Sequence, residues 1–520
     1  MTTRTHIASE ETLQRVADAL ESMAPNAVPS YDEATGRYTN ASIKGWLKRQ
    51  RDGLAYGVSI PKGSATSCTK TGANASIAKP TPGVIGTPSV DPYVGKGAFF
   101  FVEVNGGVDA DGTPYVTAID GDANFTRAND TWIMAPVLYT SETETDDAVT
   151  LSVSDTCQAG MRVQPGGMLP DGTIRPFMLY AKYGLSVDDD GTLHTASGRQ
   201  LKRFVSHDSG VTLCKTATTG YSFRNSADDW YVKAMLLLKY GTKNSQSVLH
   251  GCTDYTYQLT PTLDESGVRR VVVSSNDAAK VLVGSSFALG THTGTSTDRG
   301  TAYNYDVFTA ATVTSKVDLD GSNTALYFDI DSDIDVRTSY LLSTEPWPAG
   351  SCDAVEGDGS PTSCIDGKQP FVIQGIELGY GCYEVLGNVV LYSSGSGWSA
   401  FLNNDTKAEV AGGKPDSAVE VGTFPGSTAE GWNYGLYPRT SSGLMMQQGT
   451  GASTSTGICD GNYKSADAAT GYHEWLSLGD VGRGAVAGLW YVSGGSGTAD
   501  AGWSFGSRLS ANGRSRGESA

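Results

Sequence analysis

The chain has 520 residues, with 38 lysines and arginines against 56 aspartates and glutamates, and a formal net charge of -18. This length predicts several folded units. Because an evenly spread negative charge repels phosphate backbones and anionic headgroups, we expect neither nucleic acid binding nor membrane insertion. The 64 glycines and the 18% share of charged residues favour a β-rich, loop-rich protein.

The beginning of the chain lacks the apolar core of a secretory signal, and no segment approaches the ~18 apolar residues of a membrane helix. We therefore expect a soluble protein made in the cytoplasm. Residues 10–23 have apolar side chains at helical spacing and predict a first helix.

A second short helix is expected after Asn40, and residues 1–60 are predicted to form a helical attachment region. Its Trp46, Lys48, Arg49 and Arg51 make a local basic island in an acidic chain. Such an island is either an attachment face for another protein or an ordinary solvated helix face.

Residues 61–155 predict a β-rich domain of short runs separated by Gly, Asp and Asn turns. The expected strands are Ala98–Val104, Pro114–Ile119 and Thr131–Tyr139. The turn from Asp109 to Gly112 does not continue into a calcium-binding loop, so a solvated turn is expected there.

The strongest helix signal follows Ser226, with acidic residues in the first turn, an apolar stripe and a terminating Gly241. Residues 253–346 then resemble many short strands, including Val268–Val273, Val281–Val283, Ala310–Thr314 and Ala325–Asp329. They predict a small β-barrel inserted into a larger domain. Alternate aspartates from Asp329 to Asp335 are interpreted as a solvated strand face rather than a calcium site.

The C-terminal third contains two segments with a family resemblance. The stretch Gly375–Val389 (GIELGYGCYEVLGNV) resembles a segment of the C-type-lectin-like superfamily, which includes formylglycine-generating enzymes and the variable proteins of diversity-generating retroelements. The ending Ala487–Val492, followed by Trp503–Leu509 and Gly513-Arg514, is similar to the closing strands of that family. Upstream, Asp171–Phe177, Ala181–Tyr183 and Asn244–Ser247 look like segments of phage and prophage structural proteins built on the same fold.

The resemblance implies an α+β, multi-domain, β-rich protein with a C-type-lectin-like domain at 156–252 and 347–520, interrupted by the insert at 253–346. It implies a virion structural protein located in the particle, in contact with other virion proteins. The expected role is a receptor-binding tail fibre or tail-tip protein for a host-surface glycan or protein, and the alternative is a capsid decoration or head-fibre adhesion protein. By analogy with viral fibres, we expect a homo-oligomer, with a trimer as the guess.

Two departures from the family limit what the resemblance implies. Val390-Leu391 replaces the family's Trp-Glu, so a core aromatic is missing at that position. The enzymatic members use a pair of cysteines near the C-terminus, whereas here the last 150 residues contain only Cys382 and Cys459, far apart. We therefore expect no enzyme, no catalytic residues and no cofactor.

The predicted ligand-binding face is the loop that follows Trp490, because its small polar residues are flanked by aromatic anchors. Trp490 and Trp503 themselves are interpreted as core residues of paired strands. The candidate binding residues are Tyr491, Ser493, Ser496, Thr498, Asp500 and Ser504.

The cysteines and histidines do not predict a metal site, because neither a CxxC pair nor a suitable His spacing is present. The eight cysteines are either buried thiols or disulfides, and Cys352 with Cys364 is the easiest pair to imagine. His250 beside Cys252 could be drawn as a dyad, but core packing is the preferred interpretation.

Overall fold

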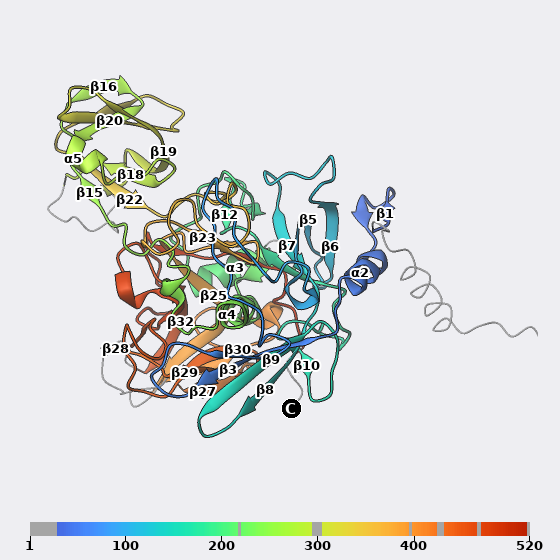
Figure 1. The fold of residues 1–520 in the computed structure, drawn as a ribbon. Helices are drawn as coiled ribbons and strands as arrows, with labels where there is room; N and C mark the ends of the chain where they lie inside the picture. The colour runs from blue at the N-terminus through green and yellow to red at the C-terminus, as the bar shows by residue number, and fades with distance from the viewer. Residues whose placement is uncertain are drawn as a thin grey trace, which may run out of the picture.

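The computed structural model describes residues 29–216, 220–293, 304–394, 398–423, 431–464 and 470–516. Within them the fold is β-rich, with short helices set among several sheets (Figure 1). One unit stands apart from the main body, at the upper left of Figure 1. The helix expected at residues 10–23 lies outside the described residues. None of the described helices combines the length and the apolar character needed to cross a bilayer.

A five-stranded sheet forms one side of the body. Its strand order is β10 (Arg162–Val163), β8 (Tyr139–Glu144), β9 (Ala148–Ser154), β3 (Ala55–Pro61) and β4 (Thr69–Gly72). Tyr56 and Val58 of β3 and Leu151 of β9 are buried on its inner face, since alternate residues of a strand point to the same side.

A six-stranded sheet joins distant parts of the chain. Its order is β14 (Ser222–Phe223), β35 (Leu509–Ser510), β11 (Met178–Ala181), β7 (Thr131–Ala135), β5 (Val102–Val108) and β6 (Pro114–Ile119). The antiparallel pairing of β7 with β11 carries the sheet across the expected boundary at residue 155. The prediction of a separate 61–155 domain is therefore wrong, because these strands complete a sheet and a core shared with the C-terminal half.

An eight-stranded sheet forms the C-terminal part of the body. Its main path is β27 (Val419–Thr423), β26 (Trp398–Leu402), β25 (Tyr383–Ser393), β32 (Gly471–Leu478), β33 (Gly488–Ser493), β31 (Asn462–Lys464) and β28 (Gly431–Asn433), and β34 (Phe505–Gly506) pairs with β25. The register of β25 on β32 shifts between Val385 and Val390, which bends the long strand.

Four two-stranded ribbons complete the body. They are β1 (Tyr31–Asp32) with β2 (Arg37–Tyr38), β12 (Ser186–Val187) with β13 (Leu193–His194), β23 (Phe371–Ile373) with β24 (Ile376–Leu378), and β29 (Tyr437–Ser441) with β30 (Leu444–Gln448). Single helical turns lie at η1 (Gly97–Phe99), η2 (Ser245–Ser247), η4 (Thr406–Ala408) and η5 (Gly484–Val486).

The strongest predicted helix is confirmed as α4 (Ser226–Tyr240), which ends at Gly241 with a φ of 60°. Its N-cap is Asn225 rather than Ser226, and the Asp228 side chain completes a capping box. The expected apolar stripe is buried, and so is the rest of the helix, because all fifteen residues are buried. Ion pairs compensate the burial of charged residues in this helix. The Lys239 Nζ lies 2.5 Å from Asp358 and 2.8 Å from Asp91.

The second expected helix is confirmed as α2 (Asn40–Arg49). The hydroxyl of Thr39 caps it by accepting a hydrogen bond from the Ser42 N–H at 3.4 Å. Ile43 and Leu47 are buried, as their spacing predicts. A further helix, α3 (His207–Thr216), lies beside the eight-stranded sheet and contacts β25.

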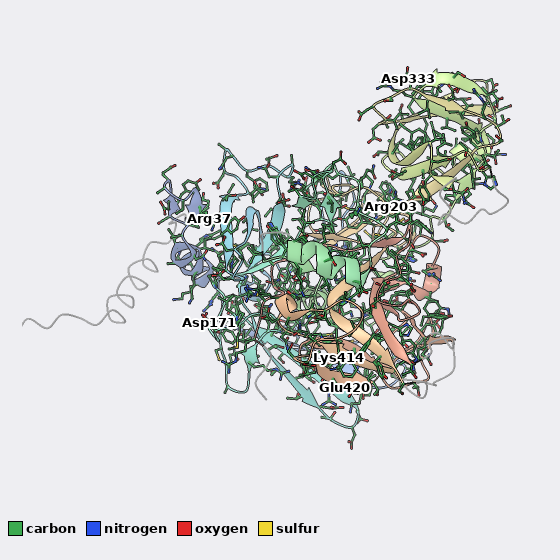
Figure 2. The ribbon with its side chains drawn as sticks, turned by 180° about the vertical axis from the view of Figure 1, so that it is seen from behind. Arg37, Asp171, Arg203, Asp333, Lys414 and Glu420 are labelled. Atoms are coloured by element: carbon green, nitrogen blue, oxygen red, sulfur yellow. The ribbon has the colours of Figure 1, made fainter. Side chains whose placement is uncertain are left out.

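The insert at 253–346 has a hydrophobic core of its own. Its six-stranded sheet runs β15 (Gln258–Leu259), β22 (Leu341–Glu345), β18 (Ser286–Gly290), β19 (Phe308–Asp318), β20 (Asn323–Phe328) and β17 (Arg270–Ser274), with β16 (Glu265–Val268) paired to β21 (Ile334–Val336) and the short α5 (Ser275–Ala278) beside it. The Thr262 N–H donates to the Val272 carbonyl at 2.8 Å, so the sheet curls until its outer segments meet. Arg203 pairs with Glu345 where the insert joins the body (Figure 2).

Two expected strands start or end elsewhere. The run Ala98–Val104 begins as η1, and only its last residues enter β5. The apolar side chain of Phe99 contributes to the core from a helical turn and not from a strand. Its ring packs on Tyr56, with ring centroids 5.1 Å apart. The run Thr131–Tyr139 is split into β7 and β8 around Pro136, which has no N–H for a ladder.

One predicted strand is absent. Residues 281–283 form a loop and a turn in which Val281 is buried and Val283 is 54% exposed. Three adjacent apolar residues were too short a signal to separate a buried loop from a strand.

Candidate functional site

The candidate site is one face of the eight-stranded sheet, formed by β25, β26, β27 and β32. In antiparallel register Tyr392 lies opposite Ser399 on one side and Tyr472 on the other, and Phe401 lies opposite Glu420. Directly paired residues share a face, so these side chains point to the same side of the sheet. We call this set the aromatic face: Tyr392, Ser399, Phe401, Lys414, Glu420 and Tyr472.

Its three rings are half-buried, which leaves part of each available to a ligand. The rings of Tyr392 and Tyr472 lie with centroids 5.0 Å apart at an interplanar angle of 52°. Rigid aromatic rings offer large contact area at low entropic cost, and a phenol adds a hydrogen-bonding end.

Charged and hydroxyl groups surround the rings. The Ser399 hydroxyl donates to the Glu420 carboxylate at 2.7 Å, and the Lys414 Nζ lies 5.1 Å from the centre of the Phe401 ring. Figure 2 shows Lys414 and Glu420 near each other in the lower part of the body. A cation, an anion and a hydroxyl beside aromatic rings suit a ligand that has both polar groups and apolar faces.

The opposite face of the same strands holds the rings in place. Leu391 and Trp398 are buried there in one cluster with Trp475. The ring of Trp398 packs on His473, with centroids 4.7 Å apart. Trp398 therefore places an aromatic ring beside Leu391 in the core on this side of the sheet.

A buried acidic residue, Glu474, lies on β32 next to the aromatic face, where the start of α3 contacts the strand. Glu474, two residues beyond Tyr472, accepts a hydrogen bond from the His207 N–H at 2.9 Å through Oε2, while its Oε1 has no partner among the described residues. Burial raises the pKa of Glu474 to about 9, and the negative charges of Asp500 and Asp208 act in the same direction. Burial also raises the pKa of Glu409 to about 7.

Glu474→Gln is expected to make the protein less sensitive to rising pH. A folded pKa near 9 exceeds the unfolded value of about 4.3, so the folded state holds a proton that the unfolded state releases. This group therefore lowers stability as pH rises above about 4.3, by up to about 1.4 kcal/mol per pH unit, until the folded pKa is reached. The amide keeps the Oε acceptor for His207 and does not titrate.

Urea unfolding at pH 5 and pH 8 checks this expectation. The gap between wild type and Glu474→Gln should widen towards pH 8 in favour of the variant. Glu420→Gln, on the same sheet but exposed, is the matched control and should follow wild type. Parallel pH profiles for wild type and Glu474→Gln would contradict the assignment.

The predicted ligand-binding loop is only partly at the surface. Tyr491, Ser493, Thr498 and Ser504 are buried, so the prediction of an exposed face is wrong for these four. The loop continues beside β32 after β33 ends, because the Glu474 N–H donates to the Ser496 carbonyl at 3.1 Å. Its small residues therefore fill space against the sheet rather than project from it.

Ser496 is half-buried and Asp500 is exposed, and these two remain at the surface. The Asp500 carboxylate accepts a hydrogen bond from the Gly497 N–H at 2.7 Å, which fixes the turn. Both lie next to the part of β32 that carries Tyr472, so the accessible part of the predicted loop borders the aromatic face.

The two tryptophans expected in paired strands differ. Trp490 lies in β33 and is 1% exposed, as predicted. Trp503 lies in a turn before β34 and is only half-buried, so its placement in a strand is wrong.

The predicted attachment residues lie on and just after α2. The ring of Trp46 packs edge-on against Phe100, with centroids 5.5 Å apart, so this residue serves the core as well as the surface. Lys48 and Arg51 line a small cleft of about 210 Å³ together with Lys44, and Arg49 is half-buried. The structure thus gathers two cations of the basic island, Lys48 and Arg51, around one cleft with Lys44.

The structure also places the cysteines, His250 and Asp109, which were considered as candidates in the sequence. All eight cysteines are free thiols, so no disulfide joins Cys352 to Cys364. His250 Nδ1 lies 3.2 Å from the Ile365 carbonyl, and Cys252 is buried in a separate apolar cluster. Asp109 pairs with Arg37 at 2.9 Å, and both side chains are partly exposed.

The aromatic face was missed at the sequence level. The signal that could have found it is the alternation in Trp398-Ser-Ala-Phe401-Leu402, where the residues that are not in the core recur at every second position. That signal does not reveal which strands are neighbours. Comparison of the chain with protein-family models and with curated proteins finds no match.

Proposed function

We propose that this protein is a structural component of a bacteriophage particle that binds a host-surface glycan or protein through the aromatic face. The observation that supports the binding role is the arrangement of Tyr392, Phe401 and Tyr472 on one sheet face beside Ser399, Lys414 and Glu420. Half-buried aromatics beside polar groups can stack on a sugar ring or anchor a protein loop.

The C-type-lectin-like fold is part of the same proposal. The segment that resembles the family's closing strands ends in β35, which pairs with both β11 and β14. The insert leaves and re-enters the body near Tyr255 and Trp347, whose ring centroids are 6.3 Å apart. These contacts support a body that includes 156–252 and 347–520 and is interrupted at 253–346, with strands from before residue 156 paired into it.

Attachment to the particle through residues 1–60 also remains a proposal. It is supported by the grouping of Lys44, Lys48 and Arg51 around one cleft in a chain of net charge -18. A homotrimer is the proposed assembly by analogy with viral fibres.

The experiment compares the binding of purified variants to cells of a susceptible bacterial strain. Tyr392→Ala and Tyr472→Ala are each expected to weaken binding by about tenfold or more, as for loss of an aromatic anchor at an interface. Tyr327→Ala is the matched control, because Tyr327 is also a half-buried tyrosine on a strand but lies in the insert.

Melting curves of all three variants show whether truncation has damaged folding. The proposal requires that the two sheet-face variants lose binding while their melting matches that of Tyr327→Ala. Unchanged cell binding of both sheet-face variants, or an equal loss in Tyr327→Ala, would reject the aromatic face as the receptor contact.

A further inference from the structure

A cleft of about 490 Å³ lies beside the aromatic face. Its walls come from α3, from β14, from η4 and from the segment that follows β35. This volume is in the range of sites for small organic ligands. The segment from Asp405 to Lys414 borders both places, since Lys407 and Glu409 line the cleft and Lys414 lies over Phe401.

Three cations line this cleft although the chain as a whole is strongly acidic: Lys215, Lys407 and Arg514. The Lys215 Nζ donates to the Glu409 carbonyl, which carries no net charge to balance it. Arg514 is shared between the Asp405 carboxylate, 3.4 Å from its Nε, and the Ala110 carbonyl. The lining therefore carries excess positive charge and favours an anionic ligand group.

Glu409 supplies a second, independent feature. It is 3% exposed, lines the cleft, and its Oε1 has no hydrogen-bond partner among the described residues. A buried polar atom without a partner costs free energy unless a ligand or water satisfies it. A ligand hydroxyl can pair with this oxygen once the Glu409 side chain turns towards the cleft, because Oε1 is enclosed by protein in this structure.

The rest of the lining is mixed. Val211 and Phe223 contribute apolar surface, and the hydroxyls of Ser222 and Thr406 lie close to Gly513. A Cβ on Gly513 would lie 2.3 Å from the Ser222 Oγ and 2.6 Å from the Thr406 Oγ1. Glycine at this position thus allows the two hydroxyl-bearing segments to approach each other at the cleft.

We infer that this cleft binds an acidic sugar, meaning a sugar ring that carries a carboxylate. Lys215, Lys407 and Arg514 attract the carboxylate, Glu409 and the hydroxyls of Ser222 and Thr406 pair with ring hydroxyls, and the apolar lining contacts the ring. Inorganic phosphate fits less well, because it would leave the apolar surface of Val211 and Phe223 uncovered. The inference rests on the proposed glycan-binding function and specifies the charge of the glycan.

The test uses the full chain and calorimetric titration with three carboxylated monosaccharides, glucuronate, galacturonate and N-acetylneuraminate, and with neutral glucose. At least one acid should bind saturably, and about tenfold or more tightly than glucose, as expected for a charge-assisted contact. Lys407→Glu should weaken that binding by about tenfold or more. Lys407 is exposed, so the variant should melt as wild type does.

Lys79→Glu is the matched control, since Lys79 is an exposed lysine outside the cleft and its reversal changes the net charge equally. Failure of all three acids to bind, equal binding of glucose, or an equal loss in Lys79→Glu would overturn the inference. Titration with a longer acidic oligosaccharide shows whether the natural ligand is a polymer or a free monosaccharide. If Tyr392→Ala weakens binding of the oligosaccharide, the ligand is a polymer that reaches the aromatic face. If Tyr392→Ala has no effect, the ligand is a free monosaccharide. Cell binding that depends on Tyr392 while every acid fails would reject the cleft and leave the proposed function standing.

Discussion

Glu384→Ala is expected to lower the free energy of unfolding by about 3–5 kcal/mol, because it leaves two buried arginines without their shared carboxylate. Glu384 is 1% exposed. Its Oε1 lies 2.6 Å from Arg508 Nη2 and its Oε2 lies 2.7 Å from Arg224 Nη1. Arg224 and Lys233 in turn share Asp229 on α4, at 3.0 and 2.6 Å.

The protonation of Glu384 reflects this balance. Burial alone would raise its pKa, but Arg508 and Arg224 outweigh burial and hold the pKa below the usual value. The carboxylate is therefore charged at neutral pH. Its removal leaves the positive charges of Arg508 and Arg224 buried without a negative partner.

Urea unfolding followed by tryptophan fluorescence measures the loss. Arg269→Ala is the control, because Arg269 and Asp333 form an ion pair in which the side chains are 53% and 60% exposed. An exposed pair contributes about 0–1 kcal/mol, so this variant should stay close to wild type. A similarly small effect of Glu384→Ala would show that the buried network does not organise the body.

Trp490→Ala is expected to cost about 3–5 kcal/mol, as for truncation of a fully buried aromatic residue. The ring lies in the central cluster of the body, and the Lys233 Nζ is 5.3 Å from its centre. Trp503→Ala should cost less, about 1–2 kcal/mol, because Trp503 is half-buried in a turn.

The two tryptophan variants form a matched pair with the same chemical change at different burial. Both are measured by urea unfolding followed by far-ultraviolet circular dichroism, since each lacks one fluorophore. Equal losses for the two would contradict the burial difference on which the placement of β33 and the following turn depends.

Local signals in the sequence predicted two of the described helices, α2 and α4, but not α3 or α5. The acidic first turn and Gly241 marked α4, and the apolar spacing of Ile43 and Leu47 marked α2, because caps and periodicity act within a few residues. Short strands with local turns also marked the insert at 253–346, where β18, β19 and β20 follow one another in the sequence and pair in that order.

Partners that are distant in the sequence could not be predicted in the same way. Nothing local to Thr131–Ala135 reveals that it pairs with Met178–Ala181, so the expected boundary at residue 155 was wrong. The same limit hid the aromatic face, whose Tyr392 and Tyr472 are eighty residues apart in numbering and become neighbours only through the register of β25 on β32. Small residues such as Ser493 and Thr498 indicated a loop, but their burial depends on what packs over them.

The pairing of β35 on both sides has a consequence for the order of folding. Leu509–Ser510 lies between β14 and β11 within its sheet, so two strands from the first half of the chain can be joined only after nearly all of it has been synthesised. Contacts of such long sequence separation form slowly, because the loop must be closed before they contribute. The core of the insert contains only residues of the insert itself. Its sheet can therefore form before β35 has been synthesised and added to the sheet of the body.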